Sequence, residues 1–409
     1  MTHEPRNPPT VPAYGSGSLA DLALSLLASV GEPTAPNVMG LPETRRACLL
    51  VVDGLGWELL RAHPAAAPFL SELATNAVPL SAGFPSTTVT SLGSLGTGCS
   101  PGQHGMLGYQ VIIPGEDRLL NGLHWDQRVD PRSWQPRQTI HERANAAGIA
   151  AFHVARTSFR GTGLTRAAMR GAYYRPADSI GALAAQADVA IRESEPALVT
   201  AYYDGLDGAG HVFGVGSDAW YYELAHVDKL AEQLAGALPA GATLYVTGDH
   251  GMVDVRAEDR IDVDALPVLR DGVALLGGEP RARHVYAIPG AEADVLAAWR
   301  ETLGDRAWVG SRDDVIKEGW FGAVDPGMAE RIGDVVAAAA GNTAIVATRA
   351  EPRESGLLGM HGSLTPAEQL VPMLPHPPPW RETGPLPRMD HTGPLPGLGS
   401  SGPLPGLGR

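Results

Sequence analysis

Apolar residues occur in short uninterrupted runs that predict the strands of a buried sheet. Residues 47–52, 149–154, 197–203 and 243–247 are largely apolar. Because neither face of such a run is polar, the pattern is typical of a parallel sheet that is covered on both sides. Further strands are predicted at residues 77–82, 284–288 and 344–348.

Segments with helical spacing alternate with these runs. The longest covers residues 218–238, where Leu224, Val227, Leu230 and Leu234 recur at intervals of three or four. Further helices are predicted at residues 18–30, 57–62, 88–97, 139–146, 179–192 and 291–300. The alternation favours an α/β fold, with a mainly parallel central sheet flanked by helices.

Composition divides the 409 residues into one main domain and two ends. Residues 1–17 are polar and rich in Pro and Gly, and we expect them to be disordered. The main domain spans residues 18–380, with an inserted cap at about 255–345. Residues 381–409 repeat Gly-Pro-Leu-Pro, which cannot build a core, and predict a disordered tail.

Net charge and cysteine content limit the kinds of binding partner and the cellular compartment that we expect. The net charge of −14 argues against broad binding to nucleic acid or to an anionic membrane. A small anionic substrate remains compatible, because bound metal ions can invert the local field. No transmembrane segment or signal peptide is recognised, and Cys48 and Cys99 do not imply a disulfide framework. We therefore expect a cytoplasmic protein, and the sequence leaves the oligomeric state open.

Six side chains with metal-binding chemistry follow the predicted strands or lie in a glycine-flanked loop. They are Asp53, Asp207, His211, Asp249, His250 and His361. Open α/β sheets bind ligands at the carboxyl ends of their strands, and residues four apart can face one point. Mixed carboxylate and imidazole ligands suit zinc, although manganese and iron are not excluded. Each residue alone is more often a turn aspartate or a buried histidine, but their joint occurrence indicates a metal site.

A hydroxyl-rich turn at residues 83–91 precedes the predicted helix 88–97. A threonine there is most often a helix cap, but the free N–H groups of a helix N-terminus also attract phosphoryl groups. Three arginines downstream are further candidates to hold a phosphate, although exposed arginines are common: Arg156, Arg160 and Arg166. The segment 109–135 is predicted to be irregular and to form the rim of a substrate pocket.

The motifs together resemble the alkaline phosphatase superfamily, and most closely its nucleotide pyrophosphatase/phosphodiesterase branch, over residues 47–372. The resemblance rests on Val51-Val52-Asp53-Gly54, Phe84-Pro85-Ser86-Thr87-Thr88, Thr97-Gly98, His104-Gly105, Asp207-x-x-Gly-His211, Gly248-Asp249-His250-Gly251 and His361-Gly362. It implies an alkaline phosphatase-like catalytic domain with two divalent metal ions, Zn²⁺ being the expected metal. One ion is expected on Asp207, His211 and His361, and the other on Asp53, Asp249 and His250, next to Thr88.

The resemblance also assigns the catalytic residue. Thr88 occupies the position of the family's nucleophile, which is itself a metal ligand and forms a phosphoryl-threonine intermediate. Thr87 is the alternative candidate for the nucleophile. Two positions depart from the family pattern. Val89-Thr90-Ser91 replaces Phe-Pro-Asn, and the asparagine that binds the phosphoryl oxygen falls on Tyr109, whose hydroxyl is expected to bind substrate instead.

The expected function is therefore a metal-dependent phosphoric ester hydrolase of the phosphodiesterase/nucleotide pyrophosphatase type, acting on a small phosphoester or nucleotide. A phosphomonoesterase, a metal-dependent phosphomutase and a metal-binding protein without turnover are the alternatives. A sulfatase is rejected, because Cys99-Ser100-Pro101-Gly102-Gln103 lacks the arginine of the sulfatase motif.

Overall fold

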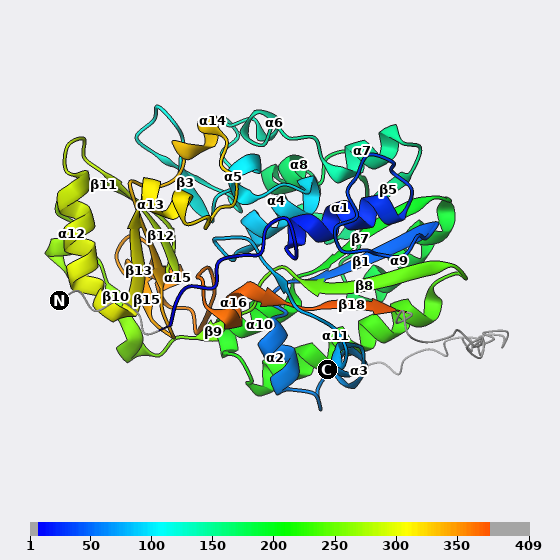
Figure 1. Cartoon of the computed structure of the whole chain (residues 1–409). Helices are drawn as coiled ribbons and strands as arrows, with labels where there is room; N and C mark the ends of the chain where they lie inside the picture. The colour runs from blue at the N-terminus through cyan, green and yellow to red at the C-terminus, as the bar shows by residue number, and fades with distance from the viewer. Residues whose placement is uncertain (1–6, 377–409) are drawn as a thin grey trace, which may run out of the picture.

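A six-stranded sheet forms the centre of the molecule in the computed structural model, which describes residues 7–376 (Figure 1). The strand order is β18-β8-β1-β7-β5-β6. The bounds are Arg46–Val52 (β1), Ala150–Ala155 (β5), Tyr173–Pro176 (β6), Ala197–Tyr203 (β7), Ala242–Gly248 (β8) and Met373–His376 (β18). Only β18 runs antiparallel to its neighbour, so the predicted mainly parallel α/β sheet is confirmed.

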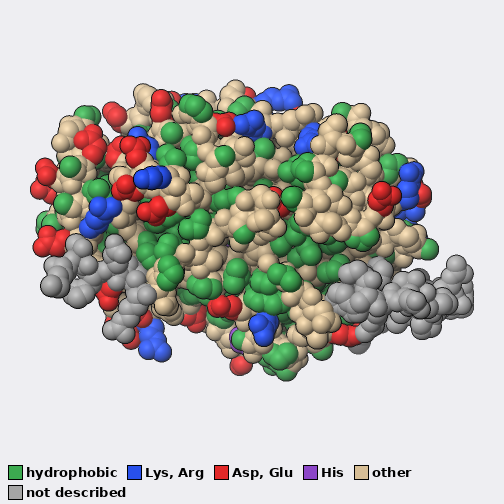
Figure 2. Space-filling view, viewed as in Figure 1, with side chains coloured by type: hydrophobic (Ala, Val, Ile, Leu, Met, Phe, Trp, Pro, Cys, Tyr) green, Lys and Arg blue, Asp and Glu red, His purple; other side chains and the backbone are tan. Residues whose placement is uncertain are grey.

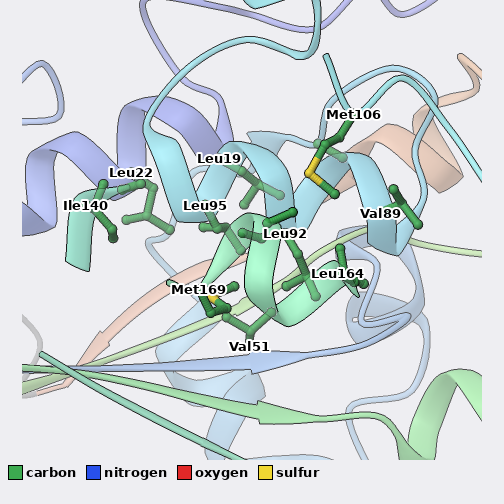
Figure 3. Packing of buried hydrophobic residues seen from close by; sticks show 14 of the residues in the cluster. Leu19, Leu22, Val51, Val89, Leu92, Leu95, Met106, Ile140, Leu164 and Met169 are labelled. Atoms are coloured by element: carbon green, nitrogen blue, oxygen red, sulfur yellow. The ribbon is translucent and has the colours of Figure 1, made fainter. Parts of the chain in front are cut away.

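The uninterrupted apolar run of β1 is explained by burial on both faces. Leu49 and Val51 join a core with α1 (Leu19–Ser29), α4 (Thr88–Thr97), α7 (Ile140–Ala146) and α8 (Gly163–Ala168). Figure 3 shows Val51 facing the apolar side chains of these helices. Cys48 and Leu50 point to the other side, where α2 (Trp57–Ala62), α3 (Pro68–Ala74), α9 (Ile180–Glu193) and α11 (Asp218–Ala237) pack.

Three predicted strands lie outside the central sheet: residues 284–288 fall mostly in the second sheet described below, and the other two form short pairs. Of residues 77–82, only Leu80–Ser81 (β2) is extended, and it pairs with Leu370–Val371 (β17). Ala344–Val346 (β15) pairs with Arg260–Asp262 (β10). The apolar character of these segments reflects burial against the core rather than membership of the sheet. Two further short pairs are Gln110–Ile112 (β3) with Leu119–Asn121 (β4), and Val253–Asp254 (β9) with Gly359–Met360 (β16).

A second sheet lies at the end of the molecule that carries α12, within the segment expected to form a cap (Figure 1). It is antiparallel, with the order β11-β12-β14-β13. Its strands are Val273–Glu279 (β11), Ala282–Ala287 (β12), Ala307–Ser311 (β13) and Val335–Ala339 (β14), accompanied by Glu292–Leu303 (α12) and Arg312–Lys317 (α13). The remaining helices are Pro101–His104 (α5), Pro131–Trp134 (α6), Gly205–Phe213 (α10), Pro326–Ala329 (α14), Pro352–Ser355 (α15) and Pro366–Gln369 (α16).

The N-terminal segment differs from its expected disorder. Residues 7–17 lie against the domain, where the Thr10 N–H donates to the Leu364 carbonyl and the Tyr14 hydroxyl donates to the Trp320 carbonyl at 2.9 Å. Composition predicted a disordered segment, because composition does not reveal specific contacts of this kind. Residues 1–6 and the predicted tail 381–409 lie outside the described residues.

The surface agrees with the acidic composition. Figure 2 shows acidic side chains gathered at the end of the molecule that carries α12. Within residues 7–376, no helix combines the length and the apolar character needed to cross a membrane.

Candidate active site

Three neighbouring strands bring most of the predicted ligands to one edge of the sheet. Asp53 follows β1, and Asp249 and His250 follow β8 directly. Asp207 lies on α10, which begins just after β7. Because β8, β1 and β7 are adjacent and parallel, their carboxyl ends meet, as expected for a ligand site in such a sheet.

Helix α10 presents the first pair of ligands. Asp207 and His211 are one helical turn apart, and His211 Nε2 lies 3.2 Å from Asp207 Oδ2. The other ring nitrogen, Nδ1, lies 2.7 Å from the Gly359 carbonyl and orients the ring. Gly54 has φ of +76° and approaches the Asp207 backbone so closely that an added Cβ would lie 3.1 Å from its Cα. A glycine is therefore required at this turn.

The second pair follows β8. His250 Nε2 lies 3.2 Å from Asp53 Oδ1 and 3.6 Å from Asp249 Oδ2. Asp249 Oδ1 accepts hydrogen bonds from the Gly54 N–H at 3.1 Å and from the His250 N–H at 3.0 Å. These bonds leave Asp249 Oδ2 without a hydrogen-bond partner among the described residues.

His361 arrives from a distant part of the chain, directly after β16. Its ring stacks on His250 with a centroid separation of 3.6 Å, and its Nδ1 lies 2.9 Å from the Ser86 carbonyl. Its Nε2 faces Asp207 Oδ1 at 3.7 Å. The loop that carries His361 thus contacts both ligand pairs and the turn that precedes α4.

Thr88 is the first residue of α4 and faces these ligands. Its hydroxyl lies 3.4 Å from both carboxylate oxygens of Asp53 and 3.3 Å from His250 Nε2. Thr87 has the extended backbone of a helix cap, yet its side chain makes no capping bond. Helix α4 is held against β8 by the Ser91 hydroxyl, which donates to the Asp249 carbonyl at 2.7 Å.

The ligand atoms form two sets, each within 4.8 Å. One contains Asp207, His211 and His361, as the resemblance implied. The other contains Asp53, Asp207 and His250, so Asp207 takes part in both and Asp249 stands beside the second set. The grouping differs from the expected one because spacing along the chain does not determine which carboxylate oxygen points inward.

Electrostatics make this cluster suited to cations. Burial and the nearby Asp249 raise the pKa of Asp53 well above its usual value. Burial also raises the pKa of Asp249, and Asp207 adds to the effect. Burial lowers the pKa of His250, but Asp249 and Asp53 outweigh it and raise this pKa to about 10. Asp207 Oδ1 and Asp249 Oδ2 are buried without hydrogen-bond partners among the described residues. Such orphaned oxygens, together with imidazole nitrogens, fit divalent metal ions.

Two side chains at the site were not predicted from the sequence. The Tyr202 hydroxyl donates to Asp53 Oδ2 at the end of β7. Glu279, at the end of β11, lines the same pocket as Thr87 and Thr88. Neither belongs to a recognised motif; the one signal was Tyr202 at the end of a predicted strand.

A pocket of about 560 Å³ opens in front of Thr88. Its walls include the apolar side chains of Leu92, Leu123, Phe159, Leu164 and Met169. Part of the segment 109–135 lines it, as expected for a rim, although this segment contains the β3–β4 hairpin and α6 rather than irregular chain alone. The pocket is large enough for a substrate with a substantial leaving group.

Tyr109 lines the pocket, but its hydroxyl donates to Glu354 Oε1 at 3.1 Å. Of the candidate arginines, Arg156 pairs with Asp204 at 2.5 Å, while Arg160 and Arg166 line a separate cavity of about 440 Å³. None of these three arginines lines the pocket at Thr88.

Comparisons with known proteins agree with this architecture. A family profile described as type I phosphodiesterase / nucleotide pyrophosphatase matches residues 47–364. Murine ectonucleotide pyrophosphatase/phosphodiesterase 5 superposes with a TM-score of 0.64 at 19% identity, covering 80% of this chain and 87% of that one. The human counterpart superposes with a TM-score of 0.63 at 21% identity, covering 81% of this chain and 87% of that one. Phosphonoacetate hydrolase from Sinorhizobium meliloti 1021, in complex with phosphonoformate, gives 0.63 at 19%, with 82% and 90% covered. Among curated proteins, none matches the sequence significantly.

The fold and the family match define a phosphoester hydrolase of the alkaline phosphatase superfamily. Since the profile covers most of the sequence, the chain belongs to the type I phosphodiesterase / nucleotide pyrophosphatase family.

Proposed function

We propose that the chain hydrolyses small phosphodiesters, including nucleotide derivatives, through a phosphoryl-threonine intermediate at Thr88. The observation that carries the proposal is the approach of the Thr88 hydroxyl to Asp53 and His250 within 3.3–3.4 Å. A murine relative in an inactive threonine-to-alanine form, in complex with AMP, supports a threonine nucleophile and a nucleotide-type ligand.

We also propose two divalent metal ions, with Zn²⁺ as the preferred metal. The ligands would be Asp207, His211 and His361 for one ion, and Asp53, Asp249 and His250 for the other, with Thr88 beside it. The two orphaned carboxylate oxygens of Asp207 and Asp249 support this assignment. When bound, such ions stabilise negative charge on phosphoryl oxygens and lower the pKa of a coordinated hydroxyl.

The residues of the chain then have distinct tasks. The Thr88 oxygen attacks phosphorus while the bond to the leaving group breaks. The N-terminal N–H groups of α4 face the phosphoryl oxygens, where the helix dipole favours negative charge. The apolar pocket wall receives the leaving group. A water molecule next attacks phosphorus and releases Thr88 and the phosphorylated product.

The Thr88→Ala variant tests the nucleophile. We expect kcat for a chromogenic phosphodiester to fall by at least ~10³-fold, while the metal content stays that of the wild type. Rapid quenching of the wild type followed by mass spectrometry should find a phosphorylated peptide that contains Thr88.

Thr87→Val is the matched control, and it should retain most of the activity. If Thr87→Val loses turnover and Thr88→Ala does not, the nucleophile is Thr87. Efficient cleavage of a phosphomonoester with little diester cleavage would favour a phosphomonoesterase, and isomerisation of a phosphate ester would favour a phosphomutase. Bound metal without any turnover would identify a binding protein.

A further inference from the structure

The tip of the β11–β12 hairpin brings a carboxyl group from the cap into the active-site pocket. Glu279 is the last residue of β11, its exposed fraction is 6%, and it lines the pocket together with Thr87 and Thr88. It also packs on the loop of His361, since a Cβ added to Gly362 would lie 2.9 Å from Glu279 Cγ. A carboxyl group this deeply buried is expected to have a partner or a function.

The hairpin tip is held firmly. Arg281, two residues on, is fully buried, and its Nε and Nη2 donate to Glu368 Oε1 and Oε2 at 3.0 and 2.5 Å. Gly278 has φ of +80°, and an added Cβ would lie 2.0 Å from the Ala282 carbonyl oxygen. The backbone is therefore built for a tight turn that fixes the position of Glu279.

The Glu279 carboxyl is incompletely paired. The Thr87 side chain lies close enough to favour the charged form of this carboxyl, but Oε1 has no hydrogen-bond partner within residues 7–376. The printed contacts of the nearby Arg283 are with other groups: its Nη1 lies 2.7 Å from Glu351 Oε2, and its Nε donates to the Ile345 carbonyl at 2.8 Å. Its Nη2 has no hydrogen-bond partner among the described residues. Burial raises the pKa of Glu279 to about 8, although Thr87, His250 and Arg283 oppose the rise.

Positive charge is scarce on this wall. Among the described residues that line the pocket, Arg353 is the one arginine or lysine, and it adjoins Glu354 on α15. A phosphoryl group attached to Thr88 would share the pocket with the Glu279 carboxyl. When ionised, that carboxyl repels a neighbouring anion. A phosphomonoester dianion brings one more negative charge to this wall than a phosphodiester monoanion does.

We propose that Glu279 is a specificity-determining residue that makes the site prefer the singly charged phosphoryl group of a phosphodiester over the doubly charged group of a phosphomonoester. This inference rests on the proposed function, and it names the substrate class of the same site. The observation that supports this inference is a buried and incompletely paired carboxyl group beside the turn at Thr87 and Thr88.

The test compares kcat/KM for a chromogenic monoester and diester with the same leaving group at pH 9. In Glu279→Gln, which keeps the size of the side chain and its capacity to hydrogen-bond, we expect the monoester/diester ratio of kcat/KM to rise by ~10-fold. Glu301→Gln removes an exposed carboxylate from α12 of the same cap and should leave the ratio unchanged. A ratio that stays constant in Glu279→Gln overturns the proposal.

A structural role for Glu279 predicts a different outcome. If Glu279 simply positions the turn through Thr87, Glu279→Gln should leave the ratio unchanged, because the amide can still pair with Thr87, whereas Thr87→Val should change it. This result would also overturn the proposal. Binding gives a readout that does not need turnover. Calorimetry with inorganic phosphate at pH 9 on zinc-loaded Thr88→Ala should show ~10-fold tighter binding once Glu279→Gln is added.

The two proposals fail separately. A wild type that cleaves neither ester refutes the proposed function, whereas phosphate binding that is unchanged by Glu279→Gln refutes the role of Glu279.

Discussion

A buried histidine makes the stability of this enzyme depend on pH. His104, which the resemblance placed in a His-Gly motif, is fully buried beside α4. The Met106 N–H donates to its Nδ1 at 3.1 Å, so the proton is on Nε2, which lies 3.1 Å from the Ser94 hydroxyl. Burial, with a contribution from Arg331, lowers the pKa of His104 from 6.5 to about 3. The folded state therefore holds His104 neutral.

This shift predicts a loss of stability in acid. Because the unfolded histidine binds a proton near pH 6.5 and the folded one does not until about pH 3, stability is fully present above 6.5 and falls as the pH drops. At about pH 5 the loss from His104 should be about 2 kcal/mol. Urea unfolding at pH 8 and pH 5 measures it.

The variant His104→Gln serves as the comparison. It should be less stable than the wild type at pH 8, but it should lose about 2 kcal/mol less between the two pH values. An identical pH dependence in the two proteins would contradict the assignment.

At the scale of elements, the second sheet is joined to the segment that follows His361 by a buried ion pair. Arg281 at the β11–β12 tip and Glu368 on α16 are both fully buried. Arg281 also donates to the Gly341 carbonyl at 2.8 Å, and Glu368 Oε1 accepts from the Ser363 N–H at 3.0 Å. The backbone of α16 also contacts the loop that carries Asp249 and His250, because the Gly251 N–H donates to the Glu368 carbonyl.

Breaking this pair should be costly, because it leaves a buried carboxylate unpaired. We expect Arg281→Met to lower the free energy of unfolding by about 3–5 kcal/mol in urea titrations. The double variant Arg281→Met/Glu368→Leu removes both charges and should recover a large part of this loss. If the double variant is less stable than Arg281→Met, the pair is not the origin of the effect.

For the whole molecule, the cluster of buried carboxylates and imidazoles predicts that metal ions stabilise the fold. Zinc at a hundred to a thousand times its Kd should add about 3–4 kcal/mol to the free energy of unfolding. Unfolding with a chelator, and again after zinc is restored, measures this contribution.

Asp207→Asn is the matched variant, since Asp207 belongs to both ligand sets. The effect of the chelator on its stability should be clearly smaller than in the wild type, because the variant lacks a ligand of at least one ion. A chelator effect as large as that of the wild type would show that the ions bind elsewhere.

The sequence predicted the parts of the molecule that local pattern controls. Uninterrupted apolar runs identified β1, β5, β7 and β8 because strands buried on both faces have no polar side. The ligands could be predicted because adjacent parallel strands end at the same edge, which brings residues far apart in the chain together.

The remaining features depend on contacts that no local pattern encodes. Glu279 reaches the pocket at Thr87 and Thr88 through a hairpin of a separate sheet, and only the packing of the two sheets determines this approach. The shared position of Asp207 depends on side-chain orientation. The packing of residues 7–17 was not apparent from their polar, proline-rich composition, since specific hydrogen bonds help to hold them.

The Tyr14 hydroxyl has a consequence for anyone who shortens this protein. It donates to the Trp320 carbonyl and accepts the Phe84 N–H at 3.0 Å, and thus joins the leading segment, the neighbourhood of α13 and the residues just ahead of Thr88. Trimming the chain back to the first helix would leave the Phe84 amide without this acceptor, four residues from the proposed nucleophile. An engineered form that begins at Ser18 should therefore be judged by its turnover as well as by its yield.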